Sequence, residues 1–194
     1  GKRGFNNFTK ATMVASAPQE KSLVGYALTA KIAATSAPEG SAESVKERRM
    51  AYYKYMAEGQ RPSVAIIEDS DFPNCVGAFW GEINTTVHKG FGVSGVVTNG
   101  VVRDLGDLPT GFPVIAGSIG PSHAFVHVRE FGKPVSVFGL AVEEGDLVHA
   151  DRHGALVIPS LVIPSLQHAI EKLIATERLV LDPASKPDFD FDAF

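Results

Sequence analysis

The sequence predicts a mixed α/β domain whose second half is rich in short strands. Up to about residue 116, short apolar runs alternate with helical segments, and this order implies parallel strands joined by right-handed crossovers. From about residue 133, short strands are joined by glycine turns, which is typical of a β-meander. Twelve prolines and nineteen glycines divide the 194 residues into short elements of this kind.

In the first half, Ser41 is a suitable N-cap for a helix that Gly59 ends. A second helix is predicted over residues 81–89. The expected strands of this half cover 23–34 (one strand or a strand pair), 63–67, 93–98 and 113–116. Those of the second half cover 134–138, 140–142, 146–149 and 155–158, and a last helix covers about 164–177.

Composition excludes several classes of protein. The formal net charge of -4 argues against a dedicated nucleic-acid binder, because such proteins neutralise phosphates with a basic face. No apolar run is long enough to cross a membrane. The N-terminal stretch has no apolar signal core, and the single cysteine, Cys75, fits a reducing compartment, so we expect a cytoplasmic protein.

The main candidate for a functional site is a pair of short motifs about 20 residues apart. Gly81-Glu82 stands at the start of the second predicted helix, and Arg103-Asp104 follows a buried strand and a glycine turn. A carboxylate at a helix start and an Arg-Asp pair after a strand could meet at one end of a sheet. Two acids and a guanidinium suit a hard divalent cation and an anionic substrate.

Three segments together resemble the RraA-like family. They are the Gly81-Glu82 to Arg103-Asp104 spacing, the run GVSGVVTNGVVRDLGDL at 92–108, and GLAVEEGDLVHADRHGALVIP at 139–159. The family contains class II pyruvate aldolases acting on 4-hydroxy-4-methyl-2-oxoglutarate and 4-carboxy-4-hydroxy-2-oxoadipate, and the regulator of ribonuclease E activity. The resemblance covers roughly residues 20 to 180, and the helix that usually precedes the family's first strand is not evident.

The resemblance implies a swivelling β/β/α domain, with mixed sheets flanked by helices, assembled as a homotrimer or a dimer of trimers. Its active sites would lie between adjacent subunits. We therefore expect a single domain over residues 1–182, followed by an acidic tail with phenylalanines over 183–194. That tail is either disordered or docked on a neighbouring subunit.

The resemblance also implies roles for the motif residues. Asp104 would bind Mg²⁺ or Mn²⁺, with Glu82 orienting water at the metal and Arg103 holding the substrate's carbonyl or enolate oxygen. The backbone at Gly81, Ile83 and Asn84 would receive the pyruvoyl carboxylate, and Glu177 roughly matches an acid that reaches into a neighbour's site. Each acid has a structural alternative: Asp104 as the cap of a turn at 105–108, and Glu82 as a first-turn helix residue. Arg103 could instead form a structural salt bridge.

Other polar residues are weaker candidates. His123 and His127 flank a variable loop near the expected cleft and could touch substrate, whereas His88 and His168 are expected on helix surfaces. The HADRH segment at 149–153 fits a tight turn better than a zinc site, and Asn99-Gly100 fits a structural turn. Cys75 fits a packing residue better than a nucleophile.

The function that follows is a divalent-metal-dependent lyase, which cleaves a 2-keto acid by a retro-aldol reaction to give pyruvate. The same enolate would permit oxaloacetate decarboxylation. The alternative is a non-catalytic regulator that binds a ribonuclease or a helicase. Glu82 favours the enzyme, because the regulators generally keep the Arg-Asp pair and lack this upstream acid.

Overall fold

The computed structural model describes residues 7–19, 22–192 and 194. Contacts between Cα atoms divide the chain into two compact units, residues 1–158 and 159–194, and each is described by itself. The expectation of a single domain continuing to residue 182 therefore stays a prediction.

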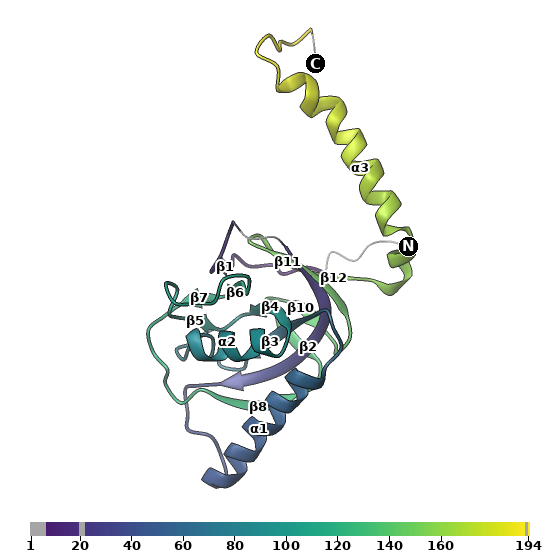
Figure 1. Ribbon diagram of the computed structural model, residues 1–194. Coiled ribbons are helices and arrows are strands. Elements are labelled where there is room, and N and C mark those ends of the chain that lie inside the picture. The colour runs from purple at the N-terminus through teal and green to yellow at the C-terminus, as the bar shows by residue number, and fades with distance from the viewer. Residues whose placement is uncertain (1–6, 20–21, 193) are drawn as a thin grey trace. The chain divides into compact units, whose positions relative to one another are not determined.

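The first unit contains two helices and all of the strands assigned in the described residues (Figure 1). The helices are α1 (Ala42–Glu58) and α2 (Glu82–Gly90). The strands are β1 (Val14–Ala15), β2 (Leu23–Ala33), β3 (Ser63–Asp69), β4 (Val93–Thr98), β5 (Val101–Val102), β6 (Val114–Ala116), β7 (Ser118–Ile119), β8 (His127–Phe131), β9 (Val135–Val137), β10 (Leu140–Val142), β11 (Leu147–Asp151) and β12 (Gly154–Ile158).

The main sheet has eight strands in the order β1-β6-β4-β3-β2-β11-β12, with β8 also paired to β2. Strands β2, β3, β4 and β6 are mutually parallel, which confirms the parallel strands that the sequence predicts. The far edge of β2 is divided between two antiparallel partners, β11 near its start and β8 near its end. The predicted mixed α/β fold with a β-rich second half is therefore confirmed.

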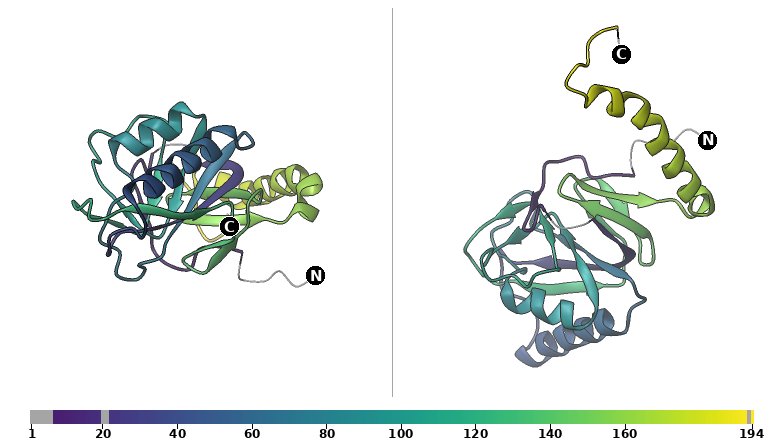
Figure 2. Two further views of the ribbon diagram at one scale, coloured as in Figure 1. Left: turned by 90° about the horizontal axis from the view of Figure 1, so that it is seen from below. Right: turned by 45° about the horizontal axis from the view of Figure 1, so that its top comes forward.

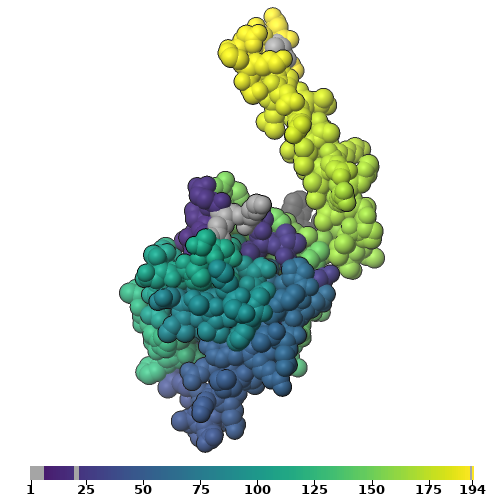
Figure 3. Space-filling model, in the orientation of Figure 1, coloured from purple at the N-terminus to yellow at the C-terminus, as the bar shows by residue number. Residues whose placement is uncertain are grey.

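Strand alternation builds a core on each face of the sheet. In β3, Ala65 and Ile67 face a cluster that includes Tyr52 and Met56 of α1, while Val64 and Ile66 face the β9–β10 hairpin. Side chains of successive strand residues point to opposite faces, so one apolar strand supplies both cores. Both α1 and α2 lie on the same face (Figure 2). Their atoms adjoin on the surface of that face (Figure 3).

Local signals explain the ends of the helices. The Ser41 side chain accepts a hydrogen bond from the Ser44 N–H, so the predicted N-cap of α1 is confirmed, and Gly59 follows its last residue. Strand β8 was not predicted, because its sequence lacks the alternation of apolar and polar residues that marks a strand. In its segment HVREF only Val128 is buried, so no apolar alternation marks it.

The second unit contains the short 3₁₀ helix η1 (Ser160–Val162) and the helix α3 (Ile163–Ala184). The last helix is thus longer than the predicted 164–177, and it includes Pro183 and Ala184 from the predicted tail. Within the described residues, no helix has the length and apolar character needed to cross a membrane.

Candidate active site

The chain brings the two halves of the motif together beside strand β5. Trp80 forms a parallel bridge with Val102, and the Arg103 N–H donates to the Trp80 carbonyl over 2.9 Å. Gly81 and Glu82 therefore run alongside Arg103 and Asp104. The convergence that the sequence spacing predicts is confirmed for the backbone of these four residues.

The Asp104 carboxylate lies at the N-terminus of α2. Its Oδ2 atom accepts a hydrogen bond from the Glu82 N–H over 3.1 Å, and the N-cap residue Gly81 makes no side-chain cap of its own. Asp104 thus caps α2 from another segment, whereas the alternative from sequence had it capping its own turn. Only its backbone carbonyl serves that turn, by accepting from the Asp107 N–H.

Two local features hold this arrangement. Asp104 has a φ of 57°, in the left-handed region that Asp tolerates better than most residues. At Gly81 the space beside the chain is taken, because a Cβ there would lie 2.5 Å from Asp104 Oδ2 and 2.9 Å from Arg103 Nε. Gly81 is therefore needed for close approach rather than for an unusual φ, since its φ of −145° is extended.

Arg103 lies half-buried next to this carboxylate. Its Nε is 3.6 Å from Asp104 Oδ2, which is an ion pair but too long for a hydrogen bond. The Nε atom is buried and has no hydrogen-bond partner among the described residues. A buried donor without a hydrogen-bond partner is costly, and here the Asp104 carboxylate at 3.6 Å is the charge that faces it.

The remaining motif residues surround the start of α2. The first N–H bonded within the helix is that of Thr85, which donates to the Gly81 carbonyl, so the N–H groups of Ile83 and Asn84 precede it. Such N–H groups bind anions readily. The Ile83 side chain is 72% exposed and the Glu82 side chain is exposed as well. The predicted acid thus faces solvent beside the site.

Asn84 also has a structural role that the sequence did not suggest. Its Oδ1 accepts from the Tyr53 hydroxyl and its Nδ2 donates to the Phe79 carbonyl, each over 2.7 Å. These bonds tie α2 to α1 and to the segment that enters the motif. The asparagine therefore fixes where α2 begins.

The expectation that His88 lies on a helix surface is wrong, because the residue is fully buried. Its Nδ1–H donates to the Asn84 carbonyl over 2.6 Å, and its Nε2 accepts from the Tyr52 hydroxyl over 2.7 Å. Burial lowers the pKa of His88 to about 4. Thr85 and His88 are three residues apart, so they share one face of α2, and both are buried there.

The other candidates fall into structural positions or separate places. Asn99 accepts from the Asp69 N–H over 2.7 Å and joins the ends of β3 and β4, as expected of a structural turn. In the HADRH segment, Asp151 accepts from the His153 N–H within the β11–β12 turn. Burial raises the pKa of the Cys75 thiol to about 12, which does not suit a nucleophile.

No group of three or more His, Cys, Asp or Glu side chains in the described part of the chain is arranged to hold a metal ion. At the motif the available carboxylates are those of Asp104 and Glu82, a pair rather than a closed cage. Glu177 lies on α3, in the second unit. Its proposed reach into a neighbouring subunit stays a prediction.

Comparisons with known proteins agree on the family. The family model described as "RraA-like: Aldolase/RraA" matches residues 4–157. Protein DlpA of Legionella pneumophila is 29% identical over 124 residues, which cover 62% of this chain and 19% of that protein. A putative 4-hydroxy-4-methyl-2-oxoglutarate aldolase of Halalkalibacterium halodurans is 27% identical over 112 residues, or 57% of this chain and 52% of the relative.

The matched part thus spans about half the length of the aldolase relative, and much less of the Legionella protein. Among solved structures, the RraAS2 protein of Streptomyces coelicolor, named as an unusual member of the RNase ES inhibitor RraA family, superposes with a TM-score of 0.65 at 20% identity. That likeness covers 94% of this chain and 86% of the other, and it shows the fold. The fold, the motif geometry and the family match lead to one conclusion: this chain belongs to the RraA-like family.

Proposed function

We propose that this chain is a divalent-metal-dependent carbon–carbon lyase that cleaves a 2-keto acid to give pyruvate. The observation that carries the proposal is the meeting of the Asp104 carboxylate, the Arg103 Nε and the first N–H groups of α2. Such a site brings together a cation ligand, a fixed positive charge and an anion-binding helix end, which come from two segments of the chain. The aldolase name of the Halalkalibacterium relative is consistent with this assignment.

The donor set fits Mg²⁺ or Mn²⁺. Mg²⁺ is usually held by one or two carboxylates together with water and substrate oxygens, so a complete protein cage is not required. Asp104 would hold the ion and Glu82 would lie beside it. When bound, the ion supplies Lewis-acid polarisation of the keto acid.

The reaction itself asks for charge stabilisation at one oxygen. When the C3–C4 bond breaks, its electron pair moves onto the C2 carbonyl to form the enolate of pyruvate, and the C4 hydroxyl loses its proton to become a carbonyl. The enolate then takes a proton at C3. The Arg103 guanidinium is always charged, and the exposed part of this side chain would bind the developing enolate oxygen.

The remaining groups would bind the substrate carboxylate and transfer protons. The N–H groups of Ile83 and Asn84 would hold the carboxylate next to the keto group, where the helix dipole favours negative charge. The exposed Glu82 carboxylate would pass protons to and from water. Oxaloacetate needs the same enolate after loss of carbon dioxide, so one set of residues would serve both reactions.

A second candidate function is a non-catalytic regulator of a ribonuclease or helicase. It is favoured by the fold shared with the Streptomyces RraA protein, which is named as a member of an RNase inhibitor family. It is disfavoured by Glu82, for which a regulator has no evident use. We therefore place it second.

The test is release of pyruvate from oxaloacetate and from 4-hydroxy-4-methyl-2-oxoglutarate, with and without Mg²⁺ or Mn²⁺. Arg103→Gln should lower kcat/KM by about 100-fold, the usual effect of removing one donor to a developing oxyanion. Asp107→Asn is the matched control, because Asp107 is an exposed acid three residues after Asp104, and it should retain activity.

Absence of pyruvate release with every divalent ion tested would contradict the lyase. If the chain also captured a purified ribonuclease or helicase under the same conditions, the regulator would become the better assignment. Equal loss of activity in Asp107→Asn and Arg103→Gln would show that the effect is not specific to the site.

A further inference from the structure

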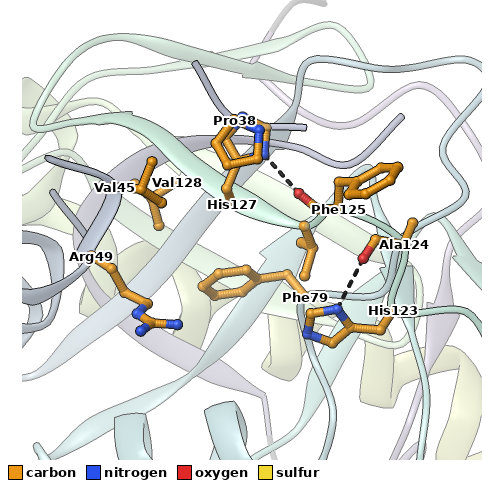
Figure 4. Close-up of a pocket in the computed structure, with 10 residues that line it drawn as sticks. Pro38, Val45, Arg49, Phe79, His123, Ala124, Phe125, His127 and Val128 are labelled. Carbon is orange, nitrogen blue, oxygen red and sulfur yellow. Dashed lines mark hydrogen bonds between the residues drawn. The ribbon is translucent and has the colours of Figure 1, made fainter. Parts of the chain in front are cut away.

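A separate cavity of about 210 Å³ lies between α1, the segment that enters the motif and the loop before β8 (Figure 4). It is lined by Pro38, Val45, Arg49, Phe79, His123, Ala124, Phe125, Val126, His127 and Val128. A second cavity of about 260 Å³ shares His127 with it and adds Arg48, Arg129 and Glu39. None of the motif residues from Gly81 to Asp104 lines either cavity.

The charges around this pair of cavities are mostly positive. Three arginines, Arg48, Arg49 and Arg129, contribute side chains, and none of them takes part in an ion pair formed by the described residues. The nearby Asp71 carboxylate already accepts hydrogen bonds from Ala34 and Thr35. Glu39 is the acid in the lining, so an anion would meet more positive than negative charge.

The two histidines are held in fixed orientations by their own loop. His127 Nδ1 lies 2.7 Å from the Phe125 carbonyl, and His123 Nδ1 lies 3.1 Å from the Ala124 carbonyl. A carbonyl only accepts, so each Nδ1 carries the proton and each Nε2 is left for another partner. Ala124 has a φ of 45°, a strained value for a residue with a Cβ. Strain of this kind is concentrated at ligand sites.

The rest of the lining is apolar. Val45 and Val128 lie on one side, and in Figure 4 the Arg49 guanidinium and the His123 ring lie on either side of the Phe79 ring. Pockets of about 300–1,000 Å³ hold drug-sized molecules, so a cavity of this size suits a smaller one. The lining therefore calls for a compact ligand with an apolar body and one anionic end.

We propose that this cavity is a second binding site, which takes a small organic carboxylate with a hydrocarbon or aromatic body. The carboxylate would be bound by Arg49, whose planar fork matches two oxygens. The body would pack on Phe79, Val45 and Val128. This site rests on its own residues and does not depend on the proposed lyase activity.

The test uses benzoate as the probe, with benzyl alcohol as an uncharged partner of similar shape and inorganic phosphate as an anion without an apolar body. Binding is measured by calorimetry and located by NMR shifts of the Val45 and Val128 methyl groups. Benzoate should bind, and Arg49→Gln should weaken it by at least about tenfold, since the charge-assisted hydrogen bonds of the guanidinium are lost. Lys46→Gln is the control, because Lys46 is exposed on α1 and lines neither cavity.

Three results would overturn the proposal. If benzyl alcohol bound as tightly as benzoate, the negative charge would not be needed for binding. If phosphate bound as tightly as benzoate, the apolar body would not be needed. Loss of benzoate binding in Arg103→Gln, with retention in Arg49→Gln, would place the carboxylate at the candidate active site instead. Arg49 is exposed, so its substitution should leave the fold intact, and a circular dichroism spectrum checks this.

Discussion

Asp104 caps a helix that begins 22 residues before it in the chain, through the 3.1 Å hydrogen bond from the Glu82 N–H to its Oδ2. The atom that fixes the start of α2 therefore belongs to the residue that we propose as the metal ligand. Structural and catalytic interpretations of Asp104 do not exclude each other here, and substitutions must be chosen to separate them.

Asp104→Asn should retain most of the stability, and Asp104→Ala should lose about 1–2 kcal/mol of unfolding free energy. Asn can still accept the Glu82 N–H and tolerates a φ of 57°, whereas Ala loses the cap and is strained at that φ. Urea unfolding at neutral pH measures the difference. Asp104→Gly, which loses the cap but is not strained, should fall between the two; an Ala variant as stable as the parent would show that the cap contributes nothing.

Gly81→Ala should lower lyase activity by about 100-fold while leaving the fold intact. The new Cβ would displace Asp104 Oδ2 and Arg103 Nε, and shifts near 1 Å at a site have effects of this size. Activity and Mn²⁺ binding followed by electron paramagnetic resonance measure the change. Gly106→Ala is the matched control, since a Cβ at Gly106 would meet nothing within 4 Å, and it should behave as the parent does.

The buried His88 should make the protein less stable in mild acid. Folding lowers its pKa from 6.5 to about 4, so between these pH values the unfolded chain binds a proton that the native chain does not. This contribution to stability is complete above pH 6.5 and is lost as the pH falls towards 4. At about 1.4 kcal/mol per pKa unit it amounts to roughly 3 kcal/mol.

Urea unfolding at pH 7, 6 and 5 measures this slope. His88→Gln should be less stable at pH 7 and should have a shallower pH dependence over the same range. Tyr52→Phe removes the donor to Nε2 and should cost about 1–3 kcal/mol, because a buried acceptor is left without a partner. An unchanged slope in His88→Gln would assign the acid sensitivity to other groups.

Cys75 should react slowly with thiol reagents in the native protein. Its pKa of about 12 lies well above the usual 9.0, so roughly 1,000-fold less thiolate is present at pH 7.5. The reaction with Ellman's reagent, followed in buffer and in denaturant, measures the protection without ambiguity, since Cys75 is the single cysteine. A native rate equal to the denatured rate would contradict the burial.

Sequence patterns predicted the strands with continuous apolar runs, and Ser41 marked the start of α1. β3 and β4 are buried on both faces of the sheet, and strands of this kind are recognised by a nearly continuous run of apolar residues. The approach of the Glu82 backbone to Asp104 was also predictable, because a helix start and the end of a strand can meet at one edge of a sheet. β8 was missed because its exposed, charged residues hide the alternation.

Several features of the site could be seen only in the structure. The spacing predicted that Asp104 lies near Glu82. It did not predict that the Asp104 carboxylate accepts a hydrogen bond from α2 rather than from its own turn. The burial of His88 was missed because a polar residue in a short helix has no periodic signal strong enough to outweigh its polarity. The hydroxyl of Tyr52, 36 residues away, provides the partner that makes this burial possible.

The repeated pentapeptide VIPSL shows that the same local sequence can adopt two different conformations. Its first copy, residues 157–161, ends strand β12 and enters η1, whereas its second copy, residues 162–166, leads from η1 into α3. The sequence alone determined the fold class and the residues of the motif, because apolar periodicity and strand order are local properties of the chain. Tertiary structure decided the conformation of each VIPSL copy and the partners of Asp104 and His88, because hydrogen bonds across 20 or more residues exist only once the strands are paired.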